Sequence, residues 1–251
     1  MRNYPRKDVK MMMEKLKELF EASNQVVIFT GAGMSTESGL PDFRSKDRGL
    51  WEKFNPDELA NIQALIDNAE EFTSFYQHRL ADIDQHQAHI GHYVLAKYEQ
   101  EGKISGIITQ NVDGFHHDAG SKNVKELHGS FRDLYCHDCK KSYTRDTYLK
   151  PTSYCECGGT IRPGIVLFGE MLPQDTFKEA EDLAEQADLF IVLGSSLTVS
   201  PANMFPLLAK ENEAKLVIIN QESTPYDKFA DLIIQDKSIK EVLEEMDQSL
   251  A

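Results

Sequence analysis

Long apolar runs are missing from this chain. No stretch approaches the roughly 18 to 20 consecutive apolar residues that span a bilayer, and the first ten residues carry charges and a proline instead of an apolar run. A secretory signal peptide needs such a run near its start. We therefore expect neither a transmembrane segment nor a secretory leader, and we expect a cytoplasmic protein without a membrane partner.

Basic residues are also few for a chain of this size. The 27 lysines and arginines stand against 41 aspartates and glutamates, which gives a net charge of −14. This balance argues against a broad nucleic-acid-binding surface, so we expect no nucleic-acid partner. It is compatible with basic peptide partners. The 41% hydrophobic and 27% charged composition is otherwise that of an ordinary globular protein.

Cysteine is scarce, and its copies are confined to one short stretch. The four cysteines are Cys136, Cys139, Cys155 and Cys157. Their spacing is C-x2-C, fifteen residues, then C-x-C. In a reducing compartment, clustered thiols favour metal binding over disulfides. Four thiolates fit a closed tetrahedral zinc site, which leaves no open position, so the expected zinc is structural. The alternative is a set of unliganded buried thiols.

Short apolar runs without polar alternation recur along the chain. They cover residues 26–30, 106–109, 189–193, 216–219 and 232–234. Such runs are typical of parallel strands that are covered on both faces. Helical patterns lie between them, including one stripe within residues 177–187 and another within 239–246. Alternating strand and helix signals predict an α/β fold with a Rossmann-like parallel sheet.

Two stretches interrupt this alternation. Residues 45–90 have a helical, polar and aromatic pattern, and residues 132–164 hold all the cysteines. We predict that the helical insertion and the zinc ribbon pack together as a small domain. Segments 1–44, 91–131 and 165–251 would then form the Rossmann-like nucleotide-binding domain.

The first apolar run ends in Gly31-Ala32-Gly33. Glycines at this place let a backbone approach a pyrophosphate, whose charge the following helix N-terminus favours. Thr36 replaces the third glycine of the dinucleotide pattern, and a plain tight turn is the alternative. The next loop brings a carboxylate, an aromatic ring and a guanidinium, which could cover a ribose and a phosphate. These are Asp42, Phe43 and Arg44, and incidental charges on an exposed loop are the alternative.

Polar residues follow the other strands at the edge where ligands bind in open α/β sheets. Gln110, Asn111 and Asp113 follow the second run, and amides there can hold the carboxamide of a nicotinamide. His128 has the side chain for removing a proton from a hydroxyl, although a structural histidine is the common case. Gly194, Ser195 and Asn220 close two later strands, where an adenosine half could bind. A polar strand end without a ligand is the alternative there.

In this order, the motifs resemble those of the sirtuin family of NAD-dependent protein deacylases, in its bacterial form. The resemblance extends from about residue 26 to residue 236. The matching motifs are Gly31-Ala32-Gly33-Met34-Ser35, Gly39-Leu40-Pro41-Asp42-Phe43-Arg44, Thr109-Gln110-Asn111-Val112-Asp113, His128-Gly129, the four cysteines, Phe168-Gly169-Glu170 and Gly194-Ser195-Ser196.

The resemblance implies a role for each matched residue. The NAD site would include Ala32, Gly33, Asp42, Phe43, Arg44, Gln110, Asn111, Asp113, Gly194, Ser195, Asn220 and Asp236 with Lys237. His128 would be the general base. An added strand of substrate peptide would bind at Val166, Phe168, Gly169 and Glu170. NAD would be a co-substrate, and the products would be nicotinamide, O-acyl-ADP-ribose and free lysine.

A further pair bears on the acyl group. Tyr76 and Arg79 match a Tyr-x-x-Arg pair that binds the acyl carboxylate in sirtuins acting on succinyl or malonyl lysine. Leu59-Ala60 resembles the small-residue position that widens their acyl pocket. The alternative is that Tyr76 and Arg79 only contact each other along one helix.

Three other functions stay open from sequence alone. Protein mono-ADP-ribosyl transfer needs the same NAD site with a different nucleophile. A hydride-transferring dehydrogenase is disfavoured by the absent third glycine, and an inert zinc-ribbon interaction module would bind partners without turnover. We expect acylated-lysine proteins as partners. The sequence does not determine the oligomeric state, and a monomer is favoured.

Overall fold

The parallel sheet lies at the centre of the structure. The computed structural model describes residues 6–45, 49–52, 54–150 and 154–250. Within these residues, six strands form one sheet in the order β3-β2-β1-β6-β7-β8, and every neighbouring pair is parallel. The strands are β1 (Val26–Thr30), β2 (Gly106–Thr109), β3 (Val124–Glu126), β6 (Leu189–Leu193), β7 (Lys215–Ile219) and β8 (Leu232–Ile234).

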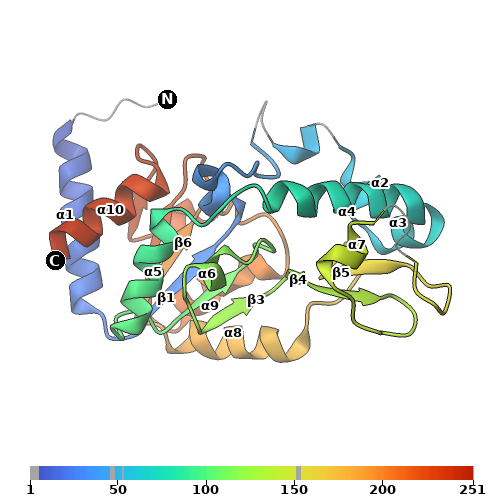
Figure 1. Ribbon diagram of the computed structural model, residues 1–251. Coiled ribbons are helices and arrows are strands. Elements are labelled where there is room, and N and C mark those ends of the chain that lie inside the picture. Colours follow the sequence, from blue (N-terminus) through green and yellow to red (C-terminus); the bar gives the residue numbers. More distant parts are fainter. Residues whose placement is uncertain (1–5, 46–48, 53, 151–153, 251) are drawn as a thin grey trace.

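Helices cover both faces of this sheet, as Figure 1 shows. Successive side chains of a strand point to opposite faces, and β1 divides its residues accordingly. Val26 and Ile28 pack against α1, α5 and α10, whereas Val27 and Phe29 pack against α8 and α9. The bounds are α1 (Arg6–Ala22), α5 (Ile90–Gln100), α8 (Gln174–Gln186), α9 (Phe205–Glu211) and α10 (Ile239–Leu250). The predicted α/β sheet is confirmed.

A smaller module lies beyond the carboxyl ends of the strands (Figure 1). Its hairpin pairs β4 (Gly129–Cys136) with β5 (Ile161–Ile165) in antiparallel register. Its helices are α2 (Pro56–Leu59), α3 (Ile62–Asp67), α4 (Ala69–Ile83) and α7 (Arg145–Tyr148). Leu65 and Phe72 from the helices share one hydrophobic cluster with Phe131 and Ile161 from the hairpin. This packing agrees with the predicted partnership of the two segments, whose domain boundaries stay a prediction.

The chain after β1 forms a 3-10 helix, η1 (Ala32–Ser38), where the sequence predicts an ordinary helix opening. The Thr36 hydroxyl donates to the Gly33 carbonyl, and Gly39 ends the element with a φ of 103°. Pro41 follows two residues later and disfavours continuation of a helix. The remaining short elements are α6 (Phe115–Asp118), η2 (Leu50–Glu52), η3 (Ala202–Met204) and η4 (Asp227–Phe229). Among the described residues, no helix combines the length and apolarity needed to cross a bilayer.

Candidate active site

A cavity of about 780 Å³ lies where the sheet's carboxyl edge meets the small module. The turns after β1, β2, β6 and β7 all contribute to its lining. The predicted NAD and peptide residues line this cavity, except Asp113 and Asp236. Asp113 lies against a smaller neighbouring pocket with Asn111. The structure therefore brings the sequence motifs together in one place.

Two glycine turns contact each other at the centre of this edge. The Gly33 N–H donates to the Gly194 carbonyl at 2.9 Å, and the Gly31 N–H donates to the Leu193 carbonyl at 3.0 Å. A Cβ on Gly33 would lie 2.7 Å from the Gly194 Cα, and Gly194 has a φ of 63°. Only glycine fits such an approach without backbone movement. The backbone of these turns lines the cavity at Gly33 and Gly194, where it suits a closely bound pyrophosphate.

Three side chains form a hydrogen-bonded chain behind the cavity wall. The Asn111 amide donates to the Ser35 hydroxyl at 3.3 Å, and that hydroxyl donates to the Asp113 carboxylate at 2.7 Å. The other Asp113 oxygen accepts from the Phe115 N–H at 2.9 Å. Burial raises the pKa of Asp113. Asp113 thus holds the Asn111 loop in place, and Ser35, to which the sequence assigns no role although it lies in the glycine motif, joins the two.

Gln110 links His128, the predicted general base, to the turn after β6. Its side-chain carbonyl accepts from the Ser195 hydroxyl at 2.7 Å, and its main-chain carbonyl lies 3.1 Å from His128 Nδ1. A carbonyl can only accept, so Nδ1 carries the proton and the lone pair is on Nε2. Burial lowers the pKa of His128, the Gln110 bond opposes this, and the Arg44 charge lowers it further. The imidazole is therefore uncharged at neutral pH, with its Nε2 lone pair available to accept a proton.

The loop after η1 is held by its own aspartate. One Asp42 carboxylate oxygen accepts from the Arg44 N–H at 2.9 Å and the Ser45 N–H at 2.7 Å. The Asp42 main-chain carbonyl accepts from the Leu50 N–H at 2.8 Å. Phe43 lies under the Arg79 guanidinium, 5.9 Å from ring centroid to Cζ. The Asp42 carboxylate thus shapes the loop that brings Phe43 and Arg44 to the cavity.

Tyr76 and Arg79 lie one turn apart on α4 and both line the cavity, together with Ala60. Tyr76 is buried among aromatic rings, and burial raises the pKa of its phenol. Among the described residues, the carboxylate that pairs with Arg79 is that of Asp82 at 3.8 Å, a weak contact for a guanidinium. Tyr76 and Arg79 are therefore neighbours along one helix and also form part of the cavity wall.

The predicted peptide-binding segment is fixed on two sides. The Val166 N–H donates to the His128 carbonyl at 2.8 Å. Phe168 exchanges backbone hydrogen bonds with the insertion, donating to the Ala60 carbonyl at 2.9 Å and accepting from the Ile62 N–H at 3.1 Å. Backbone hydrogen bonds therefore join the expected peptide edge both to His128, the predicted base, and to the helical insertion.

The far end of the cavity lies beside the start of α10. Asn220 lines the cavity, and its side-chain amide donates to the Glu222 carbonyl at 2.7 Å. Lys237 also lines it, whereas Asp236 does not. Glu37, which the sequence analysis left without a role, accepts from the Lys240 N–H at 2.7 Å and so connects η1 to α10.

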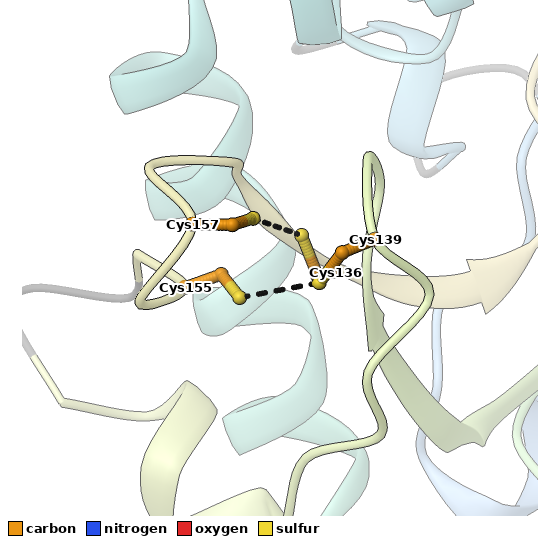
Figure 2. Close-up of side chains that lie close together, drawn as sticks. All are labelled: Cys136, Cys139, Cys155 and Cys157. Atoms are coloured by element: carbon orange, nitrogen blue, oxygen red, sulfur yellow. Dashed lines mark hydrogen bonds between the residues drawn. The ribbon is translucent and has the colours of Figure 1, made fainter.

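The four cysteine side chains point toward one another (Figure 2). Cys136 and Cys157 have their sulfurs 3.5 Å apart, as do Cys139 and Cys155. All four sulfurs lie within 4.8 Å of one another. Zinc bonded to four thiolates at about 2.3 Å separates them by about 3.8 Å, which matches this cluster. The Tyr143 hydroxyl donates to Cys155 at 2.9 Å and would support a thiolate ligand there. The residues fit one structural zinc ion.

Comparison with known proteins agrees with this arrangement. The model of the Sir2 family matches residues 31–201. The chain belongs to the Sir2 family, the sirtuins. It is 55% identical to a protein of Oceanobacillus iheyensis, over 91% of this chain and 97% of the relative. It is 56% identical to one of Geobacillus kaustophilus, over 92% and 95%. The names of these relatives are NAD-dependent protein deacetylase and NAD-dependent protein deacetylase 1.

Solved sirtuin structures have the same fold. A Sir2 complex with a p53 peptide and NAD+ superimposes with a TM-score of 0.86 at 38% identity, covering 95% of this chain and 99% of that chain. A Sir2 variant with a deacetylated p53 peptide and 3′-O-acetyl ADP ribose gives a TM-score of 0.89 at 38% identity, covering 94% and 98%.

Proposed function

We propose that this chain is an NAD-dependent protein-lysine deacylase. One observation carries the proposal: His128 shares a cavity with the paired glycine turns and with the Val166 edge. The neutral His128 ring can take a proton, and the glycine turns can approach a pyrophosphate. The family membership and the names of the relatives support the same activity.

The residues of the cavity suit successive tasks in this reaction. Bound NAD supplies an electrophilic ribose carbon and the hydroxyl that receives the acyl group. Gln110 and Asn111 hold the carboxamide, and the backbone at Gly33 and Gly194 contacts the pyrophosphate. His128 removes the proton from the ribose hydroxyl through Nε2. The acyl oxygen bonds to the ribose carbon as the bond to nicotinamide breaks, and one water is consumed when the lysine amine leaves, so the products are nicotinamide, O-acyl-ADP-ribose and free lysine.

The test removes the proposed base. His128→Ala is expected to lower deacetylation of an acetyl-lysine peptide by about 10²-fold or more, the range of a lost general base. Product masses from the wild-type protein should include O-acetyl-ADP-ribose. His78→Ala, on the exposed side of α4, is the control and should retain activity. An active His128→Ala protein with its zinc and fold intact would refute the assignment.

We further propose that the cavity accepts acidic acyl groups such as succinyl and malonyl. The Arg79 guanidinium can offer parallel N–H donors to a carboxylate, and the Tyr76 hydroxyl can donate beside it. Burial keeps the phenol protonated, because it raises the pKa of Tyr76. Ala60, a small residue in the same wall, leaves room for the longer acyl chain.

Comparing two acyl peptides in one variant tests this preference. Arg79→Met should lower kcat/KM on a succinyl-lysine peptide about tenfold or more relative to the acetyl-lysine peptide, because a charge-assisted bond is lost. The ratio of the two values is the readout, since Arg79 also contacts Phe43. An unchanged ratio would remove Arg79 from acyl recognition.

A further inference from the structure

Among the residues whose burial the structure describes, Arg162 is the largest almost completely buried side chain, with 1% of its surface exposed. It lies on β5 of the β4–β5 hairpin, called the zinc hairpin below because Cys136 ends its first strand. Its guanidinium Cζ stacks over the Tyr135 ring, 5.7 Å from the ring centroid. Its Nη1 and Nη2 donate to the two carboxylate oxygens of Glu170 at 2.6 and 2.9 Å. Nη2 also donates to the Ile165 carbonyl at 2.6 Å. The guanidinium is therefore fixed in one orientation.

Glu170 receives more than this ion pair. One of its oxygens also accepts from the Leu167 N–H at 2.8 Å, and its own N–H donates to the Leu167 carbonyl at 3.0 Å. These bonds close the turn that contains Phe168 and Gly169, whose φ is 90°. The carboxylate of Glu170 is thus engaged inside the protein, although its side chain borders the cavity.

Stability alone does not explain such a pair. Burying a charged pair costs desolvation, and apolar side chains of similar size often replace it without loss of stability. What the pair does determine is geometry, because a bidentate Arg–carboxylate contact fixes both distance and angle. Here it connects β5 of the zinc hairpin to the turn at the expected peptide edge.

We propose that Arg162 is a positioning residue for the acylated peptide. Through Glu170 it sets the course of residues 166–169, while the His128–Val166 bond fixes the start of the same segment. The zinc hairpin thereby determines where an acyl-lysine enters relative to the catalytic ring. This inference rests on the proposed deacylase function.

The test separates peptide recognition from NAD binding. Arg162→Met should raise KM for an acetyl-lysine peptide about tenfold, change kcat less than threefold, and leave the Kd for ADP-ribose within twofold. Glu170 keeps solvent access in this variant, since 26% of its side chain is exposed. The double variant Arg162→Met, Glu170→Gln removes both charges. The Arg162–Glu170 contact is lost in the single and in the double variant alike, so the two should have the same KM for the peptide.

Arg145→Met is the matched control. Arg145 lies in the same module and pairs with Asp84 at 2.5 Å, but on the exposed surface. Its KM should equal the wild-type value. An unchanged KM in Arg162→Met, or an equal loss of ADP-ribose affinity, would overturn the inference. The Kd of the acetyl peptide, measured by direct titration, tests the role of Arg162 without any need for turnover. A wild-type protein that released no nicotinamide would refute the proposed function and not this role.

Discussion

His128 shows how neighbouring groups set the chemistry of a single residue. Its tautomer is determined by the Gln110 carbonyl, and its charge by burial and by the guanidinium of Arg44. An imidazole whose pKa lies below the ordinary 6.5 stays unprotonated in mildly acidic solution. The base form is therefore available over a wider pH range than for an exposed histidine.

This lowered pKa predicts the pH dependence of the reaction. Since the unprotonated ring is the active form, kcat/KM should fall with decreasing pH only below pH 6.5. Arg44→Gln removes a positive charge and should move this acid limb toward higher pH. Rates at subsaturating peptide between pH 5 and 8.5 provide the measurement. An acid limb centred at or above pH 6.5 in the wild-type protein would contradict a lowered pKa of His128 as the base.

Single residues were predictable where a local motif carries them. Gln110, Ser195 and Asn220 follow apolar strands, so their place at the carboxyl edge could be inferred from the sequence, and they do line the cavity. Arg162 and Glu37 could not be found in this way. Their partners, Glu170 and Lys240, are determined by tertiary packing, which no local spacing encodes.

Among the elements, the turns after β1 and β6 depend on close packing of their backbones. A Cβ on Gly194 would lie 2.5 Å from the Gly33 carbonyl carbon and from the Met34 nitrogen. Both are backbone atoms, so they cannot rotate away as a side chain would. The relative position of the two strands at their carboxyl ends therefore depends on this contact.

Two alanine substitutions separate contact from conformation. Gly194 and Gly102 both have positive φ, at 63° and 72°, but a Cβ on Gly102 meets nothing within 4 Å. Gly102→Ala should cost only the left-handed strain of about 1–2 kcal/mol in unfolding free energy. Gly194→Ala should also weaken ADP-ribose binding at least tenfold, measured by calorimetry. Equal ADP-ribose affinity in both variants would show that the contact is unimportant.

The strands were predictable because burial on both faces leaves a continuous apolar run. The 3-10 type of the element after β1 was not predictable. In that element the Thr36 hydroxyl donates to the Gly33 carbonyl, and Pro41 follows it in the chain. The hairpin β4–β5 also escaped prediction as a strand pair. Its residues 129–136 mix polar and apolar positions, and its pairing shifts register between Ser130 and Leu134.

At the scale of the whole molecule, the zinc cluster and the helical insertion stabilise each other. Cys136 and Cys155 belong to the same hydrophobic cluster as Leu65 and Phe72. The cluster also contains Ile165 and Leu167, which border the cavity. Loss of the metal should therefore affect the peptide side of the cavity before it affects the sheet.

Zinc removal tests this order of events. The purified protein should contain one zinc ion per chain by elemental analysis. Chelation should lower Tm and abolish deacetylation, while ADP-ribose still binds within about threefold of its original affinity, and added zinc should restore activity. Structural zinc contributes about 10–16 kcal/mol in isolated fingers, so a large effect is expected. A metal-free protein with full activity would contradict a structural role for the cluster.

The strand order has a consequence for synthesis of the chain. β1 emerges early, but its two neighbours β2 and β6 begin only at Gly106 and Leu189. Such distant pairing slows folding, because a long loop must close before the contacts form. On the ribosome, the central strand therefore lacks its second neighbour until most of the polypeptide has been translated. Its apolar side chains are open to non-native contacts during that interval, as transiently exposed hydrophobic surface generally is.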